Sequence, residues 1–195
     1  MKKDKLESVL ATARQMFVKY GVQRTTLEEI ARFSRVAKAT IYNYFGSKDG
    51  VYLEVLNREA DNMAAKILTE VALMTFPVDK LRAFVFSSFN LLRARADIFN
   101  LRSEFLGHLI SGTENVRKKL FSMQLSILQP ILKEGTSMGF FRNDSIHAAR
   151  SILYAVRGME LTWLLDPESG EVDEDIETFF DLLCKGIVVK ENSSV

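Results

Sequence analysis

Residues 25–52 read TTLEEIARFSRVAKATIYNYFGSKDGVY, and this stretch holds two short apolar patterns separated by a break. At its start, Thr25 and Thr26 each stand three residues before a glutamate, which is the capping-box spacing of a helix N-terminus. In KATIYNYF, residues 38–45, Ile41 and Phe45 lie four residues apart and so share one helical face. The stretch predicts two helices, at about 27–33 and 38–45, joined by a short turn.

A further helix is expected before this stretch. Val9, Leu10, Ala13 and Phe17 repeat at helical spacing, and Gly21 follows as a C-terminal glycine does. Three short helices of which the last two are joined by a tight turn form a helix-turn-helix unit, with the motif at about residues 26–45.

The remainder of the chain shows helical patterns and no alternating strand pattern of useful length. We expect a long helix that starts after Ser47, and further helices at about 77–95, 97–110, 113–138, 145–165 and 174–189. The predicted fold class is all-α with about nine helices. Residues 1–47 form a helix-turn-helix domain, and residues 48–195 form a larger helical domain.

Composition and charge restrict the possible functions. The chain has 195 residues, 47% of them hydrophobic and 26% charged, which is typical of a folded globular protein. A single cysteine excludes an internal disulfide. Neither an apolar signal region nor an uncharged apolar run of about 18 residues occurs, so we expect a cytoplasmic protein without a membrane span.

The charge is unevenly placed along the chain. Residues 1–60 hold 11 Lys and Arg against 7 Asp and Glu, whereas residues 61–195 hold 15 against 18. A basic N-terminal part favours a polyanionic partner, although a solvated basic surface without a partner gives the same count. The outward face of residues 38–45 favours the first interpretation, because it carries hydrogen-bond donors that packing does not need: Lys38, Thr40, Tyr42, Asn43 and Tyr44. Such a face suits the DNA major groove.

The spacing and residue types of residues 25–52 resemble the DNA-binding region of the TetR/AcrR family of bacterial transcriptional regulators. The shared pattern is a Thr-Thr pair, an Ile-Ala pair, a turn, and a short helix that ends in Tyr-x-Tyr-Phe and is followed by a lysine. Three positions depart from the family pattern. Arg35 replaces the turn glycine, Ala37 replaces a Ser or Thr helix cap, and Ala39 replaces a frequent glycine.

The resemblance implies a set of DNA contacts. Base edges would be approached by Lys38, Ala39, Thr40 and Asn43, and the DNA backbone by Thr25, Thr26, Tyr42, Tyr44 and Lys48, while Arg35 adds positive charge beside the groove. For Tyr44, packing against the helix is an equally acceptable interpretation. Ile30, Val36, Ile41 and Phe45 would form the core of the module.

For residues 48–195 the resemblance implies a ligand cavity whose occupancy moves the DNA-binding helices. The effector would be small and mainly apolar. The candidate lining residues are Phe89, Asn90, Arg93, Phe105, His108, Phe121, Gln124, Tyr154, Arg157 and Trp163.

Two apolar helices at the end of the chain fit a two-fold dimer interface. The candidate interface residues are Ile152, Val156, Met159, Ile176, Phe179, Phe180, Leu183 and Ile187.

These features predict a homodimeric transcriptional regulator that binds a double-stranded, palindromic operator and acts as a ligand-released repressor. The alternative is a constitutive DNA-binding or architectural protein whose C-terminal part only dimerises or binds another protein. An enzyme is not expected. His108 and His147 are the only histidines, neither has metal-ligand spacing, and no catalytic or phosphate-binding motif occurs, so we expect no metal and no cofactor.

Overall fold

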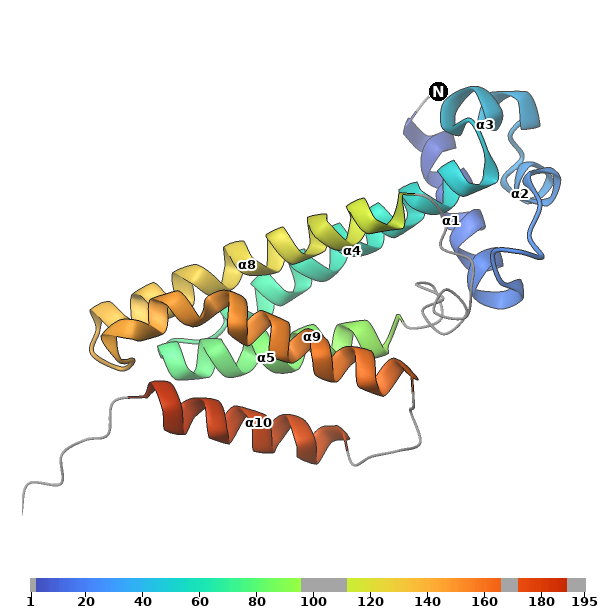
Figure 1. Ribbon diagram of the computed structural model, residues 1–195. Coiled ribbons are helices and arrows are strands. Elements are labelled where there is room, and N and C mark those ends of the chain that lie inside the picture. Colours follow the sequence, from blue (N-terminus) through green and yellow to red (C-terminus); the bar gives the residue numbers. More distant parts are fainter. Residues whose placement is uncertain (1–2, 96–111, 166–171, 189–195) are drawn as a thin grey trace, which may run out of the picture. The chain divides into compact units, whose positions relative to one another are not determined.

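The computed structural model describes residues 3–95, 112–165 and 172–188, in which the chain forms eight α-helices and one 3₁₀-helix (Figure 1). Within these residues the β-type pairing is limited to one isolated bridge, between Phe141 and Val188. The all-α prediction is therefore confirmed. The helix expected at 97–110 lies outside the described residues. No helix in the described part is long and apolar enough to cross a membrane.

The chain divides into two compact units. The first unit comprises Met1–Asp61 and Arg95–Lys118, and the second comprises Asn62–Ala94 and Lys119–Val195. Two helices of 25 residues each, α4 (Lys48–Ala72) and α8 (Thr113–Ser137), contribute to both units. The domain boundary between residues 47 and 48 stays a prediction, and in the structure the start of α4 groups with the N-terminal helices.

The first unit contains α1 (Lys3–Tyr20), α2 (Leu27–Ser34) and α3 (Lys38–Phe45), which agree closely with the predicted helices. Helix α2 contacts both α1 and α3. The core of this unit includes an edge-to-face pair between Phe17 of α1 and Tyr52 of α4, with ring centroids 5.3 Å apart. This pair ties α1 to α4.

The residues predicted to form the core of the helix-turn-helix module are buried or half-buried in the structure. Ile30, Val36 and Ile41 are buried, and Phe45 is half-buried. Because Ile41 is the only fully buried residue of α3, the other side of this short helix is left for the surface.

The turn between α2 and α3 holds two of the three positions that depart from the family pattern, Arg35 and Ala37. Arg35 adopts a left-handed conformation, with φ 56° and ψ 37°, and its backbone N–H caps the end of α2. For a residue other than glycine this conformation costs about 1–2 kcal/mol. Ala37 stands at the N-cap of α3 and offers no side-chain hydrogen bond. By contrast, Thr26 caps α2 through a complete capping box with Glu29.

The second unit contains α5 (Pro77–Arg93), a 3₁₀-helix (Asn143–Ala148), α9 (Ala149–Leu165) and α10 (Val172–Ile187). Both α9 and α10 contact α5, and Figure 1 shows all three side by side. Their facing sides form one apolar core that includes Phe84, Phe89, Leu153, Ile176 and Phe180 together with parts of α4 and α8.

Most of the residues predicted for a dimer interface belong to this core, so the assignment was wrong for the five of them that are buried, and it stays a prediction for the three that are half-buried. Ile152, Val156, Ile176, Phe180 and Ile187 are buried, and Met159, Phe179 and Leu183 pack half-buried against them. The apolar stripes of α9 and α10 are needed to cover α5 within one chain. Periodicity alone does not distinguish a stripe that packs inside the chain from one that packs on a second copy.

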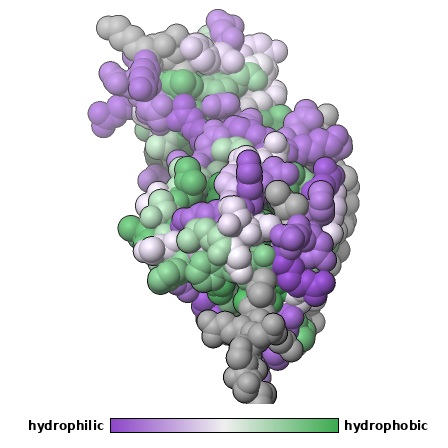
Figure 2. Space-filling view, turned by 90° about the vertical axis from the view of Figure 1, so that its left-hand side faces the viewer, coloured by the Kyte–Doolittle hydropathy of each residue, from purple (hydrophilic) through white to green (hydrophobic). Residues whose placement is uncertain are grey.

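Some apolar side chains of the second unit remain exposed where α4 ends and α5 begins. Leu73 and Phe76 are 69% and 55% exposed. Figure 2 shows green, apolar side chains between purple, hydrophilic ones on the face turned toward the viewer. The ring of Phe76 lies 6.2 Å from that of Phe140, so aromatic packing shields part of this surface.

The missing cap of α3 predicts a stabilising substitution. Ala37→Ser supplies a hydroxyl that can accept from the first free N–H groups of α3, and it should raise the free energy of unfolding by about 0.5–2 kcal/mol. Urea unfolding followed by circular dichroism measures the change. Ala39→Ser is the matched control, since it places the same hydroxyl inside the helix, where serine is slightly unfavourable. Equal effects of the two substitutions would contradict the capping explanation.

Candidate nucleic-acid interface

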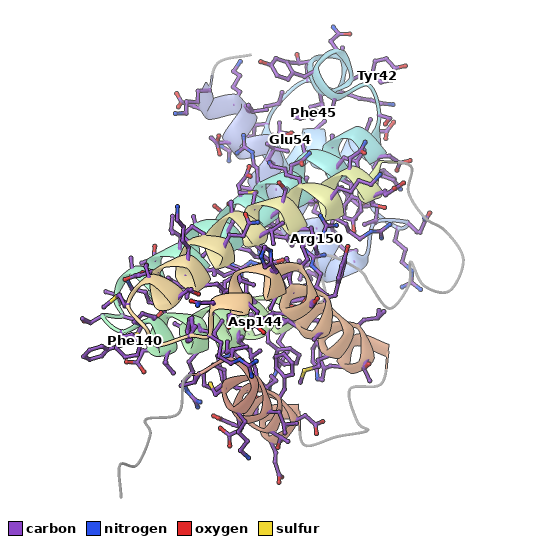
Figure 3. All side chains as sticks on the ribbon, turned by 60° about the vertical axis from the view of Figure 1, so that its left-hand side comes forward. Tyr42, Phe45, Glu54, Phe140, Asp144 and Arg150 are labelled. Carbon is purple, nitrogen blue, oxygen red and sulfur yellow. The ribbon has the colours of Figure 1, made fainter. Side chains whose placement is uncertain are left out.

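The exposed side of α3 carries the residues predicted to contact DNA. Lys38, Ala39, Asn43, Tyr42 and Tyr44 are exposed, and the two tyrosines are 58% and 52% exposed. Figure 3 shows Tyr42 at the outer side of α3 and Phe45 toward its inner side.

The alternative of a packed Tyr44 does not fit its exposure, although its ring lies 5.7 Å from that of Phe45. Thr40 is half-buried. Within the described residues no hydrogen bond engages the side chains of Tyr42, Asn43 or Tyr44, so their donors and acceptors face outward. Hydroxyl and amide groups of this kind can read base edges in a major groove or hold phosphates.

Lys38 is held by a carboxylate that the sequence did not single out. Its ammonium group donates to Oε1 of Glu28 on α2, and both side chains are exposed. The hydrogen bond from Lys38 is the main reason why the pKa of Glu28 lies below its usual value. Nothing in the helical pattern placed Glu28 beside Lys38, because the two residues are ten positions apart and meet only through the turn. A phosphate that recruits Lys38 has to displace Glu28.

The Thr-Thr pair is occupied by the protein itself. Thr25 is 1% exposed, and its hydroxyl donates to the carbonyl oxygens of Gly21 at 2.8 Å and Met16 at 3.4 Å. The expectation that this hydroxyl meets a phosphate was therefore wrong, because it faces inward. At Thr26 the backbone N–H and the hydroxyl both donate to Oε2 of Glu29, at 2.9 and 2.8 Å. These bonds lower the pKa of Glu29 and keep a negative charge at the N-terminus of α2.

Lys48 also has an internal partner. Its Nζ donates to the carbonyl oxygens of Val22 at 2.7 Å and Gln23 at 3.3 Å, in the connection that follows α1. The lysine therefore fixes the loop between α1 and α2. One ammonium proton remains for another acceptor, since an ammonium group has three.

The exposed surface of α2 adds positive charge near the turn. Arg32 and Arg35 are exposed, and the guanidinium of Arg32 lies 4.7 Å from the ring centroid of the exposed Phe33. Together with Lys38 these residues make the outer side of the helix-turn-helix module basic. Such a surface attracts a polyanion before any base is read.

The predicted ligand residues of the second unit fall into two groups. One group is joined by contacts: Arg157 donates to Oε1 of Gln124 at 2.7 Å, and its guanidinium lies 5.3 Å from the ring centroid of Phe121. Gln124 is 1% exposed. Phe89 and Trp163 form an edge-to-face pair, with centroids 6.0 Å apart. These residues bring polar and aromatic groups into the interior of the unit.

The other group does not line an interior. Asn90, Arg93 and Tyr154 are exposed, so their assignment to a cavity was wrong. Each lies on the outer side of an amphipathic helix, a position that composition alone does not reveal. Phe105 and His108 lie outside the described residues.

Two buried polar groups in the second unit were missed from the sequence. Glu160 is 7% exposed, and burial raises its pKa to about 8, which the nearby charge of Arg157 partly opposes. Ser88 of α5 is fully buried, and its hydroxyl has no hydrogen-bond partner among the described residues. Glu160 lies three positions after Arg157, one helical turn away, which is the pattern that could have identified it.

Comparisons with known proteins agree with a DNA-binding module in the N-terminal part of the chain. The family model for bacterial regulatory proteins of the tetR family matches residues 9–55. The transcriptional regulator HbdR from Aromatoleum sp. (strain CIB) is 30% identical over 78 residues, which are 40% of this chain and 34% of HbdR. The chain therefore matches only about a third of that relative's length.

Similarity also extends over the whole chain. The transcriptional repressor BepR from Brucella suis biovar 1 (strain 1330) is 27% identical over 198 residues, which cover 92% of this chain and 85% of BepR. The structure of FadR from Bacillus subtilis in complex with stearoyl-CoA is similar to this chain, with a TM-score of 0.69 and 18% sequence identity. The match covers 92% of this chain and 98% of the FadR chain. At that identity the likeness establishes the fold. These relatives are transcriptional regulators, which agrees with the prediction that the chain is not an enzyme.

The contact between Lys38 and Glu28 predicts a charge effect on DNA binding. Glu28→Gln removes a carboxylate that competes with phosphates for Lys38, so the affinity for any duplex should rise by about two- to fivefold. The slope of log affinity against log salt should steepen by about one contact. Fluorescence anisotropy of labelled duplexes at several salt concentrations measures both. The control is Glu70→Gln, which removes one exposed carboxylate from the part of α4 that belongs to the second unit. An equal gain in that variant would show that the effect comes from net charge alone.

Buried Glu160 predicts a pH-dependent stability. Between its usual pKa of 4.5 and about 8, the folded chain keeps the proton while the unfolded chain loses it. The folded state then binds more protons, so its stability falls as the pH rises through this window, by at most about 1.4 kcal/mol per pH unit.

Glu160→Gln cannot ionise, and its free energy of unfolding should fall less between about pH 5 and pH 8 than that of the unmodified chain. Urea titrations at the two pH values test this, with the exposed Glu177→Gln as the control. The same pH dependence in all three proteins would show that Glu160 is ionised in the folded state.

Proposed function

Because the chain belongs to the TetR/AcrR family of bacterial transcriptional regulators, we propose that it controls transcription by binding a specific DNA sequence through α3. The observation that carries this proposal is the outer face of α3, where Tyr42, Asn43 and Tyr44 are exposed while Ile41 anchors the helix. The site of action is the cytoplasm, where bacterial DNA is accessible.

In this proposal the residues of the interface have different roles. Asn43 and Thr40 approach base edges, since an asparagine amide can pair with adenine in a bidentate manner. Lys38 contacts DNA after it leaves Glu28. Tyr42 and Tyr44 hold phosphates, with Thr26 and Arg35 at the border of the contact. Thr25 and Lys48 support the module from within, as their internal hydrogen bonds indicate.

We further propose that two copies bind a palindromic operator, with residues 1–47 as the DNA-binding domain and residues 48–195 for dimerisation and effector binding. The outward sides of α9 and α10 are the better candidates for the dimer contact. Ser151, Ala155, Gly158 and Thr162 form an exposed stripe of small residues along α9, and Leu182 of α10 is 61% exposed. Small residues allow two helices to approach closely, and a two-fold axis lets one such face serve both copies.

An effector in the second unit would release the DNA. FadR from Bacillus subtilis binds stearoyl-CoA in its structure, and BepR acts as a repressor. In this chain the half-buried Arg157 donates to the buried Gln124 and lies over the ring of Phe121, and Phe89 packs against Trp163. A small, mainly apolar molecule with a polar group matches this combination.

Selection of bound duplexes from a random DNA pool tests the proposal. At about 150 mM salt, where non-specific electrostatic binding is weak, the purified protein should enrich one palindromic sequence. A dimeric mass in complex with that duplex would support the two-copy arrangement. No enrichment would contradict sequence-specific binding, and enrichment of a sequence without symmetry would contradict the two-copy arrangement.

Two variants in the same selection separate base contacts from phosphate contacts. Asn43→Ala should change the preferred base at one position of each half-site, by about 1–3 kcal/mol of discrimination. Lys38→Ala should weaken all sequences alike and reduce the salt slope by about one. If Asn43→Ala instead lowers the affinity for all sequences alike, Asn43 contacts phosphates rather than bases.

A further inference from the structure

A buried carboxylate in the first unit is held by two arginines from separate parts of the chain. The side chain of Glu59, on α4, is 6% exposed. It accepts from Nε of Arg14, on α1, at 2.5 Å and from Nε of Arg95, just beyond α5, at 2.9 Å. The side chain of Arg95 is 11% exposed. This charge cluster of Arg14, Glu59 and Arg95 lies wholly within the first unit.

The burial of Glu59 and Arg95 favours one geometry of this cluster over others. Charge-assisted hydrogen bonds to a buried carboxylate are strong, and removal of one partner leaves a buried charge without its compensation. The cluster therefore favours one arrangement of α1, α4 and the segment at Arg95 over displaced ones. The side chain of Arg14 is 43% exposed, so the charges that water does not readily solvate after a displacement are those of Glu59 and Arg95.

The position of the cluster in the chain gives it a further consequence. The chain passes from the first unit to the second after Asp61 and returns at Arg95. Glu59 stands two residues before the first of these points, and Arg95 is the first residue after the second. The residues next to both of these chain positions, Glu59 and Arg95, thus meet in one ion pair within the first unit, together with Arg14 of α1.

The last turns of α5 are fixed within the second unit by contacts to α9 and α10. Phe89 packs edge-on against Trp163. Arg93 pairs with Asp173 of α10 at 2.8 Å, and its guanidinium lies 5.8 Å from the ring centroid of Trp163. Only Ala94 separates Arg93 from Arg95. Arg95 is therefore two residues away from a side chain that contacts Trp163.

We propose that Glu59 and Arg95 are positioning residues that couple the placement of α1, and with it the DNA-binding helices, to the end of α5 in the second unit. The coupling rests on the proposed function, because operator binding is one of the two events that it joins. Coupling is reciprocal. DNA bound to α3 therefore alters the surroundings of Trp163, just as an effector bound in the second unit alters the placement of the DNA-binding helices.

A neighbouring ion pair offers a matched control. Arg58, the residue before Glu59, pairs with Glu7 of α1 at 2.5 Å and with Glu54 at 3.4 Å. This pair also joins α1 to α4, but it is more exposed and does not involve the end of α5. Loss of Arg58 therefore removes a contact between α1 and α4 without cutting the proposed connection.

The experiment uses the only tryptophan of the chain as its reporter. The selected operator duplex is added to the full-length protein, and Trp163 emission is recorded while the anisotropy of the labelled duplex measures binding. The unmodified protein and Arg58→Gln should show the same operator-dependent change of emission. Arg95→Gln should bind the operator but lose that change, and Arg95→Lys, which restores a charge near Glu59, should recover part of it.

The outcomes separate this inference from the proposed function. Operator binding without any change of Trp163 emission in the unmodified protein would overturn the coupling and leave the function intact. If folded Arg95→Gln, as judged by its melting curve, shows the same operator-dependent change of Trp163 emission as the unmodified protein, the coupling is also overturned. If Arg95→Gln does not fold, Glu59→Gln, which retains the shape of the side chain, provides the same test. Failure to select any duplex would remove the function and the coupling together.

Discussion

Helix α3, which we propose reads DNA, is only eight residues long, and a helix of this length is not stable on its own in water. It has no side-chain cap at its start, and the turn before it holds an arginine in a left-handed conformation. Because local interactions do not stabilise α3, the helix has to be stabilised by the packing of Ile41 against the rest of the module. The reading surface consequently depends on the packing of α1, α2 and α4.

The polar groups of the interface are engaged before DNA arrives. Lys38 is paired with Glu28, Thr26 with Glu29, and Lys48 with backbone carbonyls. Binding is thus an exchange of partners, which lowers the gain from any phosphate alone and gives more weight to base contacts. Tyr42, Asn43 and Tyr44 differ from these groups because no hydrogen bond of their side chains to another described residue has to be broken to use them. A surface of this kind favours discrimination between sequences over general affinity for DNA.

The second unit uses its apolar residues mainly for itself. The stripes on α9 and α10 cover α5, and the polar residues that enter this interior include the buried Gln124 and Glu160 and the half-buried Arg157. Burial keeps the carboxyl of Glu160 protonated at neutral pH, which limits the charge enclosed in the unit. Such an interior accommodates apolar groups with a small number of polar contacts.

The amino-acid sequence by itself determined the three N-terminal helices and the outward donors of α3, and its resemblance to the family pattern singled out Ala37 and Arg35 as departures. Each of these depends on neighbours within about four residues, so spacing and residue type were sufficient to predict them. The partner of Lys38, the inward hydroxyl of Thr25 and the arginines around Glu59 were decided only by the tertiary structure, because they join residues that are distant in sequence or oriented by packing. The same limit explains the dimer assignment: a helical stripe reports that a face is buried, whereas the partner that covers it is chosen by the fold.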